Sequence, residues 1–415
     1  MDSGSYEETY KRVEALGVKM ENYDLTNISR LYSALKLKQD FFAIHVVGTN
    51  GKGSVTAFLS SILAKAGYRT GAFVSPHLFD LRERILLNNK MIPKKDFQRL
   101  AQKIFDCMGK NNLEASYFEF TTVLAAMFFT GKKVEIAVLE AGLGGRLDAT
   151  NFFNGKINVV TSISLEHTAT LGGTIEKIAL EKAGVIKPGS VTVISKNNAG
   201  MKTVKKIAGQ KKSMVIEAGF HDTGLARGKQ SFELVNPQKK GPFRISLLGH
   251  HQAENASLAI SAALELKKFG FNITEKAIRE GFLSAENNGR LVIVGKNPLM
   301  VFDCAHNPGG FEALKKNLGL FKFKRLLLVF SVMKDKEWKK MLESFPFDEL
   351  LVSGMGIERG LDPAEVKKAF PQARVFDGIC SAIKTGKKNA KKEDLVLVAG
   401  SIHAIGLALQ CIKKH

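Results

Sequence analysis

A chain of 415 residues is too long for one ordinary hydrophobic core, so two or three domains are expected. Hydrophobic residues make up 45% of the chain and charged residues 24%, a composition typical of globular proteins. No apolar run is long enough to cross a bilayer, and the polar start MDSGSYEETY has neither signal-peptide nor transit-peptide character. We therefore expect a cytoplasmic protein without membrane contact.

The net charge of +21 points to anionic partners such as nucleotides or polyanionic metabolites. The basic residues are scattered and form no long block interleaved with aromatic residues, so nucleic-acid binding is not expected. The four cysteines, Cys107, Cys304, Cys380 and Cys411, are far apart and form no C-x-x-C pair. This spacing argues against a disulfide framework or a zinc–cysteine site.

The first part of the chain alternates short apolar strands with amphipathic helices. FFAIHVV (41–47) predicts a buried strand, and the helix-forming stretch GSVTAFLSSILAKAG (53–67) follows it. VEIAVLE (134–140) and KINVVTSIS (156–164) predict two more buried strands, each ending in a glycine-rich or polar turn. This order predicts a parallel α/β sheet.

Residues 190–249 contain four short strand-like runs, which predict a β-rich extension on the first domain. The long helix predicted over 251–270 follows, and the pattern breaks at SAENNGR (284–290) before a second βα series begins. We therefore predict an N-terminal α/β domain over 1–286 and a smaller, doubly wound, Rossmann-like domain over 287–415.

The stretch GTNGKGS (48–54) follows the first strand and opens the first helix. Three glycines let backbone N–H groups turn toward an anion, and the N-terminus of the helix favours negative charge. Lys52 supplies a cation and Ser54 a hydroxyl for Mg²⁺, although the spacing departs from the usual G-x-x-x-x-G-K-[ST] pattern. We predict a phosphate-binding loop here, and call residues 48–54 the phosphate loop.

Two further candidates follow neighbouring strands. Glu140 ends the strand at 134–140, and His167 lies three residues after the strand at 156–164. The carboxyl ends of parallel strands meet at one edge of a sheet, so Ser54, Glu140 and His167 are predicted to hold Mg²⁺ together. His167 is a softer ligand than magnesium usually takes.

The chain resembles the folylpolyglutamate synthases and dihydrofolate synthases, ATP-dependent amide ligases of the Mur ligase type. Its motifs occur in the family's order from about residue 40 to residue 401: GTNGKGS, SPHLFDLRERI, YFEFTT, LEAGLGGRLDATN, EHTATLGGTIEKIALEKAGVIKPG, GHHQAENASLAISA, DCAHNPGG and VMKDK. In this family a glycine after the lysine is normal, which accounts for the unusual spacing of the phosphate loop.

The resemblance implies which residues bind ATP, Mg²⁺, the pterin and L-glutamate. ATP would be bound by Thr49, Asn50, Gly51, Lys52, Gly53, Ser54, Asn255, Arg290 and Asp303. Two Mg²⁺ ions would be held through Ser54, Glu140 and His167, and Lys182 would be carbamylated and catalytic alongside Lys52 and His306. The pterin would be bound by Phe118, Asp148 and Ala149, and L-glutamate by His306 and Ser401.

Three residues depart from the family pattern. Glu166 stands where aspartate is usual, Cys304 where glycine is common, and His403 where an aromatic residue is usual. The last two lie near the predicted glutamate-binding residues. They bear on that end of the site more than on the ATP chemistry.

The implied reaction joins L-glutamate to dihydropteroate, to a reduced folate that already carries glutamate, or to both, in a monomeric enzyme. A carboxylate becomes reactive when the γ-phosphoryl group of ATP is transferred to it, and Lys52 and Arg290 would neutralise the charge. Two alternatives fit the sequence less well. A peptidoglycan-precursor ligase would carry a further N-terminal domain, for which residues 1–47 leave too little chain, and a nucleic-acid-binding NTPase would need a basic stripe.

Overall fold

The computed structural model describes residues 5–17, 24–226, 229–235 and 242–413. The chain divides into two compact units. The first comprises Met1–Thr223, Ser231–Ser246 and Ala253–Glu286, and the second comprises Gly224–Gln230, Leu247–Gln252 and Asn287–His415. The units are therefore interleaved in the sequence. Within the described ranges, no helix is both long enough and apolar enough to cross a membrane.

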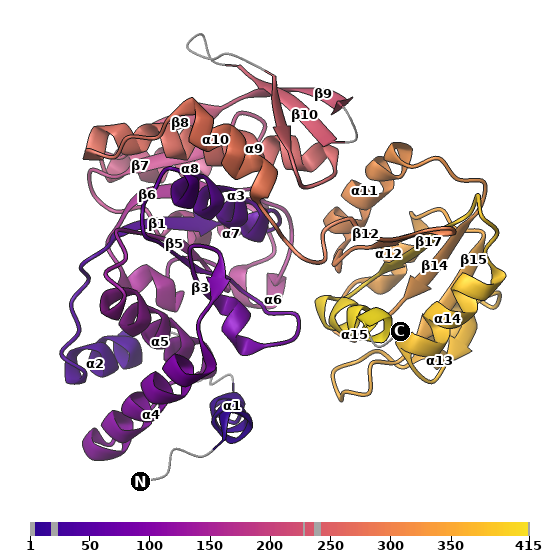
Figure 1. Cartoon of the computed structure of the whole chain (residues 1–415), viewed down its shortest axis with the longest axis horizontal. Coiled ribbons are helices and arrows are strands. Elements are labelled where there is room, and N and C mark those ends of the chain that lie inside the picture. Colours follow the sequence, from indigo (N-terminus) through magenta and orange to yellow (C-terminus); the bar gives the residue numbers. More distant parts are fainter. Residues whose placement is uncertain (1–4, 18–23, 227–228, 236–241, 414–415) are drawn as a thin grey trace. The chain divides into compact units, whose positions relative to one another are not determined.

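The first unit is built on an eight-stranded sheet (Figure 1) with the order β4-β3-β2-β5-β1-β6-β7-β8. Its strands are β1 Phe42–Val47, β2 Thr70–Phe73, β3 Ile85–Leu87, β4 Lys90–Met91, β5 Ile136–Glu140, β6 Gly155–Val160, β7 Val191–Ser195 and β8 Met214–Ala218. All neighbours from β2 to β8 pair in parallel, and the two edge pairs β2–β3 and β3–β4 are antiparallel. The predicted parallel sheet is confirmed.

Helices cover both faces of this sheet. They are α1 Tyr6–Glu14, α2 Thr26–Ala34, α3 Lys52–Lys65, α4 Lys94–Asn111, α5 Tyr117–Gly131, α6 Thr168–Leu171, α7 Ile175–Ala183, α8 Met201–Gln210, α9 His250–Glu265 and α10 Glu275–Ser284, with 3-10 turns η1 Leu81–Arg84, η2 Ala149–Phe152 and η3 Leu266–Phe269. On β1 the side chain of Ala43 belongs to the core with α1, α2, α4 and α5, and that of Val47 to the core with α7 and α8. Helix α3 packs against β1, β2 and β5, and α10 packs on α3. Ala43 and Val47 lie four positions apart and share one face of β1, whereas the buried Ile44 and Val46 lie on the other, so both faces of the sheet are buried.

The β-rich extension is smaller than the sequence predicted. A separate three-stranded sheet is formed by β9 Phe220–Ala226, β10 Lys229–Leu234 and β11 Phe243–Ile245. The two earlier runs, β7 and β8, instead continue the main sheet, with α8 between them. The lysine-rich stretch 201–212 hid this helix, which buries Val204 and Ala208, four residues apart, against the core.

The second unit contains a six-stranded sheet in the order β12-β13-β17-β14-β15-β16. Its elements are β12 Val292–Lys296, β13 Leu299–Phe302, α11 Pro308–Asn317, η4 Leu318–Leu320, β14 Leu326–Phe330, α12 Trp338–Glu343, β15 Glu349–Ser353, α13 Pro363–Ala369, β16 Arg374–Phe376, α14 Ile379–Asn389, β17 Leu395–Ala399 and α15 Ile402–Lys413. Only β12 runs antiparallel to its neighbour. Helices α11 and α12 share one core with the sheet, and α14 packs on several strands, which is the predicted doubly wound arrangement.

The short segment Leu247–Gln252 is anchored inside the second unit by Asn317. The backbone N–H of His250 donates to Oδ1 of Asn317 at 2.8 Å, and Nδ2 of Asn317 lies 3.0 Å from Nδ1 of His251. Burial, followed by the charge of Arg290, lowers the pKa of His251 to about 4. The ring is therefore neutral, and Nδ1 can accept the hydrogen bond from the amide.

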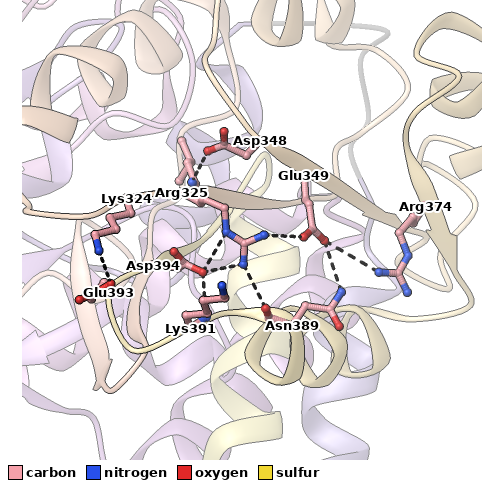
Figure 2. A network of polar contacts seen from close by, with 10 residues as sticks. Lys324, Arg325, Asp348, Glu349, Arg374, Asn389, Lys391, Glu393 and Asp394 are labelled. Atoms are coloured by element: carbon pink, nitrogen blue, oxygen red, sulfur yellow. Dashed lines mark hydrogen bonds and ion pairs between the residues drawn. The ribbon is translucent and has the colours of Figure 1, made fainter.

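The amino ends of four adjacent strands in the second unit are joined by a charge network (Figure 2). Arg325, just before β14, donates to Oδ2 of Asp394 through Nη2 at 2.7 Å and through Nε at 3.2 Å. It also reaches Oε1 of Glu349, the first residue of β15, at 3.4 Å, and Glu349 pairs with Arg374 of β16. The network lies at the end of the sheet opposite the carboxyl ends of the strands.

A disulfide joins Cys380 in α14 to Cys411 in α15, with 5.7 Å between the Cα atoms. The sequence argument against disulfides was therefore wrong for this pair. The two cysteines lie 31 positions apart and form no recognisable spacing motif, and the packing of α14 against α15 brings them together.

Asp394→Asn tests the network. The hydrogen bonds from Arg325 hold the pKa of Asp394 below its ordinary value, although burial opposes them. A carboxylate with a lowered pKa stabilises the fold above its unfolded pKa, about 3.9, and loses that effect as pH falls through the folded value. We expect a lower Tm at pH 7 and a gap to the parent that closes below about pH 4.

The matched control for this experiment is Glu393→Gln, because Glu393 makes an exposed pair with Lys324. Its Tm should stay close to that of the parent across the same pH range in thermal unfolding. If the difference in Tm between Asp394→Asn and the parent stayed unchanged at acidic pH, this would contradict the electrostatic origin of the effect.

Candidate active site

The phosphate loop leaves β1 through a turn that only glycine fits. Gly48 has a φ of +149°, and a Cβ atom there would lie 1.8 Å from Oγ1 of Thr161. An L-residue in this conformation would be strained as well as blocked. The turn therefore depends on the close approach of the backbones that follow β1 and β6.

The segment after β6 fixes the next two residues of the loop. The N–H of Thr49 donates to the carbonyl of Ser162 at 2.7 Å, and its Oγ1 donates to the carbonyl of Ser164 at 3.1 Å. Oγ of Ser162 donates to the carbonyl of Asn50 at 3.1 Å. The predicted ATP residues Thr49 and Asn50 are thus held in place by two serines that the sequence analysis did not single out.

Helix α3 begins at Lys52 with Gly51 as its N-cap residue, in the left-handed conformation (φ +93°). The N–H groups of its first turn, which includes Gly53 and Ser54, form the positive end of the helix dipole. Asn255 of α9 lies against the turn, because a Cβ on Gly51 would be 2.3 Å from its Oδ1. The predicted contact residue Asn255 therefore adjoins the phosphate loop.

The carbonyl oxygen of Gly48 accepts hydrogen bonds from two lysines. Nζ of Lys182 lies 2.7 Å away and Nζ of Lys52 lies 3.0 Å away, and Lys52 also donates to the carbonyl of Thr49 at 3.0 Å. Burial, followed by repulsion from Lys52, lowers the pKa of Lys182 to about 7, and the nearby Glu166 opposes that shift. Lys182 is thus a buried amine that loses its proton near neutral pH.

The three predicted metal ligands differ in burial. Glu140 ends β5 with 3% of its surface exposed, and its Oε2 accepts the N–H of Ser75 at 3.2 Å. Ser54 is also buried, in the first turn of α3, whereas His167 is exposed and takes a left-handed conformation before α6. Among the described residues no three His, Cys, Asp or Glu side chains gather as a metal centre. The hydroxyl and carboxylate of Ser54 and Glu140 are hard oxygen donors that fit Mg²⁺.

Two of the predicted pterin residues, Asp148 and Ala149, lie on the loop after β5, residues 142–152, which we call the acceptor loop, and the third, Phe118, lies on α5. The ring of Phe118 packs against Gly142, where a Cβ would come within 2.7 Å of it. Asp148 is fully buried, and burial raises its pKa. Its Oδ2 accepts the N–H groups of Gly142 and Leu143, each at 2.9 Å, and its Oδ1 accepts both donors of Thr150.

These four bonds fill the ordinary accepting capacity of the Asp148 carboxylate. The Asp148 carboxylate therefore shapes the acceptor loop. A direct contact between Asp148 and a pterin stays a prediction. Ala149, which opens η2, is likewise buried.

In the second unit, Asp303 follows β13 and orders the turn after it. Its Oδ2 accepts the N–H of Leu291 at 2.9 Å, and its Oδ1 accepts the N–H of Ala305 at 2.8 Å. Burial raises the pKa of Asp303, and the charge of Arg290 opposes that shift. Cys304 is buried against Gly289, and burial raises its pKa to about 12, so its thiol is unreactive.

His306 and Ser401 follow two neighbouring strands, β13 and β17. Nδ1 of His306 lies 2.8 Å from the carbonyl of Cys304, so Nδ1 carries the proton of this hydrogen bond. The turns are joined where the N–H of Gly400 donates to the carbonyl of Ala305 at 3.0 Å. Ser401 is buried at the start of α15, and burial lowers the pKa of the nearby His403.

Family models match most of the chain. The Mur ligase middle domain matches residues 46–263, and the Mur ligase glutamate ligase domain matches residues 289–402. These matches define the chain as a Mur-type ligase.

Two curated relatives narrow the class. A dihydrofolate synthase/folylpolyglutamate synthase of Escherichia coli is 31% identical, over 96% of this chain and 94% of that protein. A probable bifunctional folylpolyglutamate synthase/dihydropteroate synthase of Halobacterium salinarum is 34% identical over 88% of this chain, which spans 46% of that longer protein.

Solved structures agree with these relatives. Escherichia coli FolC in complex with DHPP and ADP superposes with a TM-score of 0.88 at 29% identity, covering 99% of this chain and 98% of that one. A bifunctional folylpolyglutamate synthase/dihydrofolate synthase with Mn, AMPPNP and L-glutamate bound gives 0.87 at 26% identity, with the same coverage. The chain therefore belongs to the folylpolyglutamate synthase/dihydrofolate synthase family of ATP-dependent ligases.

Gly51→Ala tests the phosphate loop. The new Cβ would meet Oδ1 of Asn255 and push it away from the loop. We expect the affinity for ADP, measured by calorimetry, to fall at least about tenfold, the loss of about 1.4 kcal/mol of binding free energy.

Gly67→Ala is the matched control, because Gly67 has nearly the same φ (+92°) but no atom within 4 Å of its Cβ position. Both variants should lose similar stability from backbone strain, about 1–2 kcal/mol, and only Gly51→Ala should lose ADP affinity. Equal ADP binding by the two variants would contradict the predicted role of the loop.

Proposed function

We propose that this chain joins L-glutamate to dihydropteroate, to the γ-carboxylate of a folyl-glutamate, or to both, with hydrolysis of ATP to ADP and phosphate. The observation that carries the proposal is the phosphate loop, where two lysines converge on the carbonyl of Gly48 beside the N-terminus of α3. The relatives named for these two activities support the choice of acceptor.

The reaction proceeds in two steps. An oxygen of the acceptor carboxylate attacks the γ-phosphorus of ATP, the bond to ADP breaks, and an acyl phosphate forms. The amine of glutamate then attacks the acyl carbon, the amide bond forms, and phosphate leaves with its electron pair while the amine loses a proton. Both steps depend on charge neutralisation and alignment.

The residue roles are part of the proposal. Residues 49–54 surround the phosphates of ATP, and Lys52 turns from the carbonyls of Gly48 and Thr49 to the outer phosphates. Asn255, Arg290 and Asp303 complete the nucleotide site, and Phe118, Asp148 and Ala149 form the pterin site. His306 and Ser401 hold the incoming glutamate.

Two Mg²⁺ ions would be held by Ser54, Glu140 and His167. When bound, they would neutralise the charge that develops on the transferred phosphoryl group. The buried oxygens of Ser54 and Glu140 suit a firmly held ion, whereas the exposed His167 suits one that arrives with the nucleotide.

Lys52→Ala should lower kcat at least about a hundredfold, as expected when one preorganised electrostatic contact is lost. Phosphate release in the presence of L-glutamate and dihydropteroate or a reduced folate measures the rate. The control is Lys65→Ala, an exposed lysine at the other end of the same helix, which should keep the parent rate. A Lys52→Ala enzyme with unchanged kcat would exclude the assigned role.

We also propose that Lys182 is carbamylated. Its pKa of about 7 leaves much of the amine unprotonated at neutral pH, so that its nitrogen can attack CO₂, form an N–C bond and lose a proton. The product carries a negative charge, which would replace repulsion of Lys52 by attraction and provide a carboxylate-like group near the metals.

A pH titration tests the carbamate. As pH falls through about 7, Lys182 takes up a proton and can no longer attack CO₂, so the ligase rate should fall on the acidic side and recover partly with added bicarbonate. Lys182→Met should lose both activity and the bicarbonate response. The ¹³C NMR spectrum with labelled bicarbonate should contain a carbamate signal that Lys182→Met lacks, and its absence from the parent would refute this proposal.

We further propose that residues 1–286 form an ATP-binding domain and residues 287–415 a glutamate-ligase domain, and that the protein is a monomer that binds no nucleic acid and lies in the cytoplasm. The Cys380–Cys411 disulfide counts against the last of these, because cytoplasmic disulfides are rare outside hyperthermophiles.

A further inference from the structure

The acceptor loop is packed against the end of α7, the helix that carries Lys182. Two glycines permit this contact. A Cβ on Gly145 would lie 2.8 Å from the carbonyl oxygen of Lys182, and a Cβ on Gly184 would lie 2.3 Å from Cβ of Arg146. The two backbones therefore touch directly, and a change in one must be felt by the other.

Hydrogen bonds join the same two segments. The N–H of Arg146 donates to the carbonyl of Glu181 at 2.7 Å, and the guanidinium of Arg146 pairs with the carboxylate of Glu181 at 3.0 Å. From the far end of the loop, Nδ2 of Asn151 donates to the carbonyls of Arg146 at 2.8 Å and Gly184 at 3.3 Å. Asn151, near the end of the loop, thus connects the middle of the loop at Arg146 to the turn after Lys182.

Lys187 completes the contact from the other side. Its Nζ donates to the backbone carbonyl and to Oδ1 of Asn151, both at 2.8 Å. The Lys187 side chain is partly buried, and burial, followed by repulsion from Lys211, lowers its pKa. Asn151, with 6% of its surface exposed, accordingly uses its amide oxygen and its amide nitrogen. Partly burying an ammonium group against two neutral oxygens costs free energy. The fixed geometry that this contact gives the acceptor loop would account for the cost.

We propose that Asn151 and Lys187 are positioning residues, which hold the acceptor loop in a fixed register with Lys182 and so align the acceptor carboxylate with the γ-phosphate. The inference rests on the proposed function, in which Asp148 and Ala149 of this loop bind the pterin. Lys182 in turn contacts the carbonyl of Gly48, so the same contacts continue into the phosphate loop. A shift of about 1 Å between reacting groups is enough to slow a reaction about a hundredfold.

The test uses four variants of the full chain: Lys187→Met, Asn151→Ala, the two combined, and Lys187→Arg. Steady-state kinetics with dihydropteroate or a reduced folate give kcat and the KM of the acceptor and of ATP, and thermal unfolding gives Tm. The matched control is Lys211→Met, which removes an exposed neighbouring ammonium group and should leave kcat and both KM values unchanged.

We expect Lys187→Met and Asn151→Ala each to lower kcat about tenfold or more and to raise the acceptor KM, while the KM of ATP changes by less than about twofold. The double variant should be no worse than the poorer single one, because the two residues act as one unit. Lys187→Arg, which keeps a cation and several donors, should recover most of the rate.

A fall in Tm without a change in kcat or acceptor KM would overturn the inference, and so would additive losses in the double variant. If Asn151→Ala fails to fold, Lys187→Met and Lys187→Arg decide the question by themselves. Failure of the proposed function is distinct, because the parent protein would then show no glutamate-dependent ATP turnover with either acceptor.

Discussion

The carbonyl oxygen of Gly48 organises the first unit, because two lysines from distant parts of the sequence donate to it. Lys52 comes from the helix that follows β1, and Lys182 from the end of α7. The two lysines meet at a position where Gly48 approaches Thr161 with no side chain between them. That approach depends on the parallel pairing of β1 with β6. Burial of Lys182, followed by repulsion from Lys52, lowers its pKa and makes it a weak base.

Both units place their candidate residues at the carboxyl ends of parallel strands and their stabilising charges elsewhere. In the second unit Asp303 and Ser401 follow β13 and β17, whereas Arg325, Glu349 and Asp394 stand at the opposite, amino ends. Charge pairs thus secure the second sheet from the edge opposite its candidate ligand-binding residues. The arrangement is the usual one for open α/β sheets, in which ligands bind where strands end.

The parts of this structure that depend on local patterns could be predicted from the sequence. Buried strands, the glycine-rich loop and the two α/β units follow from apolar runs, turn residues and motif order. Contacts between segments far apart in the sequence could not. The disulfide between Cys380 and Cys411 depends on how α14 meets α15, and the contact of Lys187 with Asn151 depends on two glycines that carry no spacing signal. The bonds that occupy Asp148 come from its own loop, yet a sequence does not reveal which polar groups an aspartate faces.

The interleaving of the units has a consequence for how such a protein can be divided or recombined. Leu247–Gln252 precedes most of α9 in the chain but is secured to Asn317, 65 residues beyond Gln252, by bonds from His250 and His251. A gene fusion that exchanged only the part after residue 286 would separate these partners and leave a buried, neutral histidine facing a foreign helix. The second unit is therefore discontinuous in the sequence. An exchange of this unit between relatives would preserve its interior only if Leu247–Gln252 were exchanged with it.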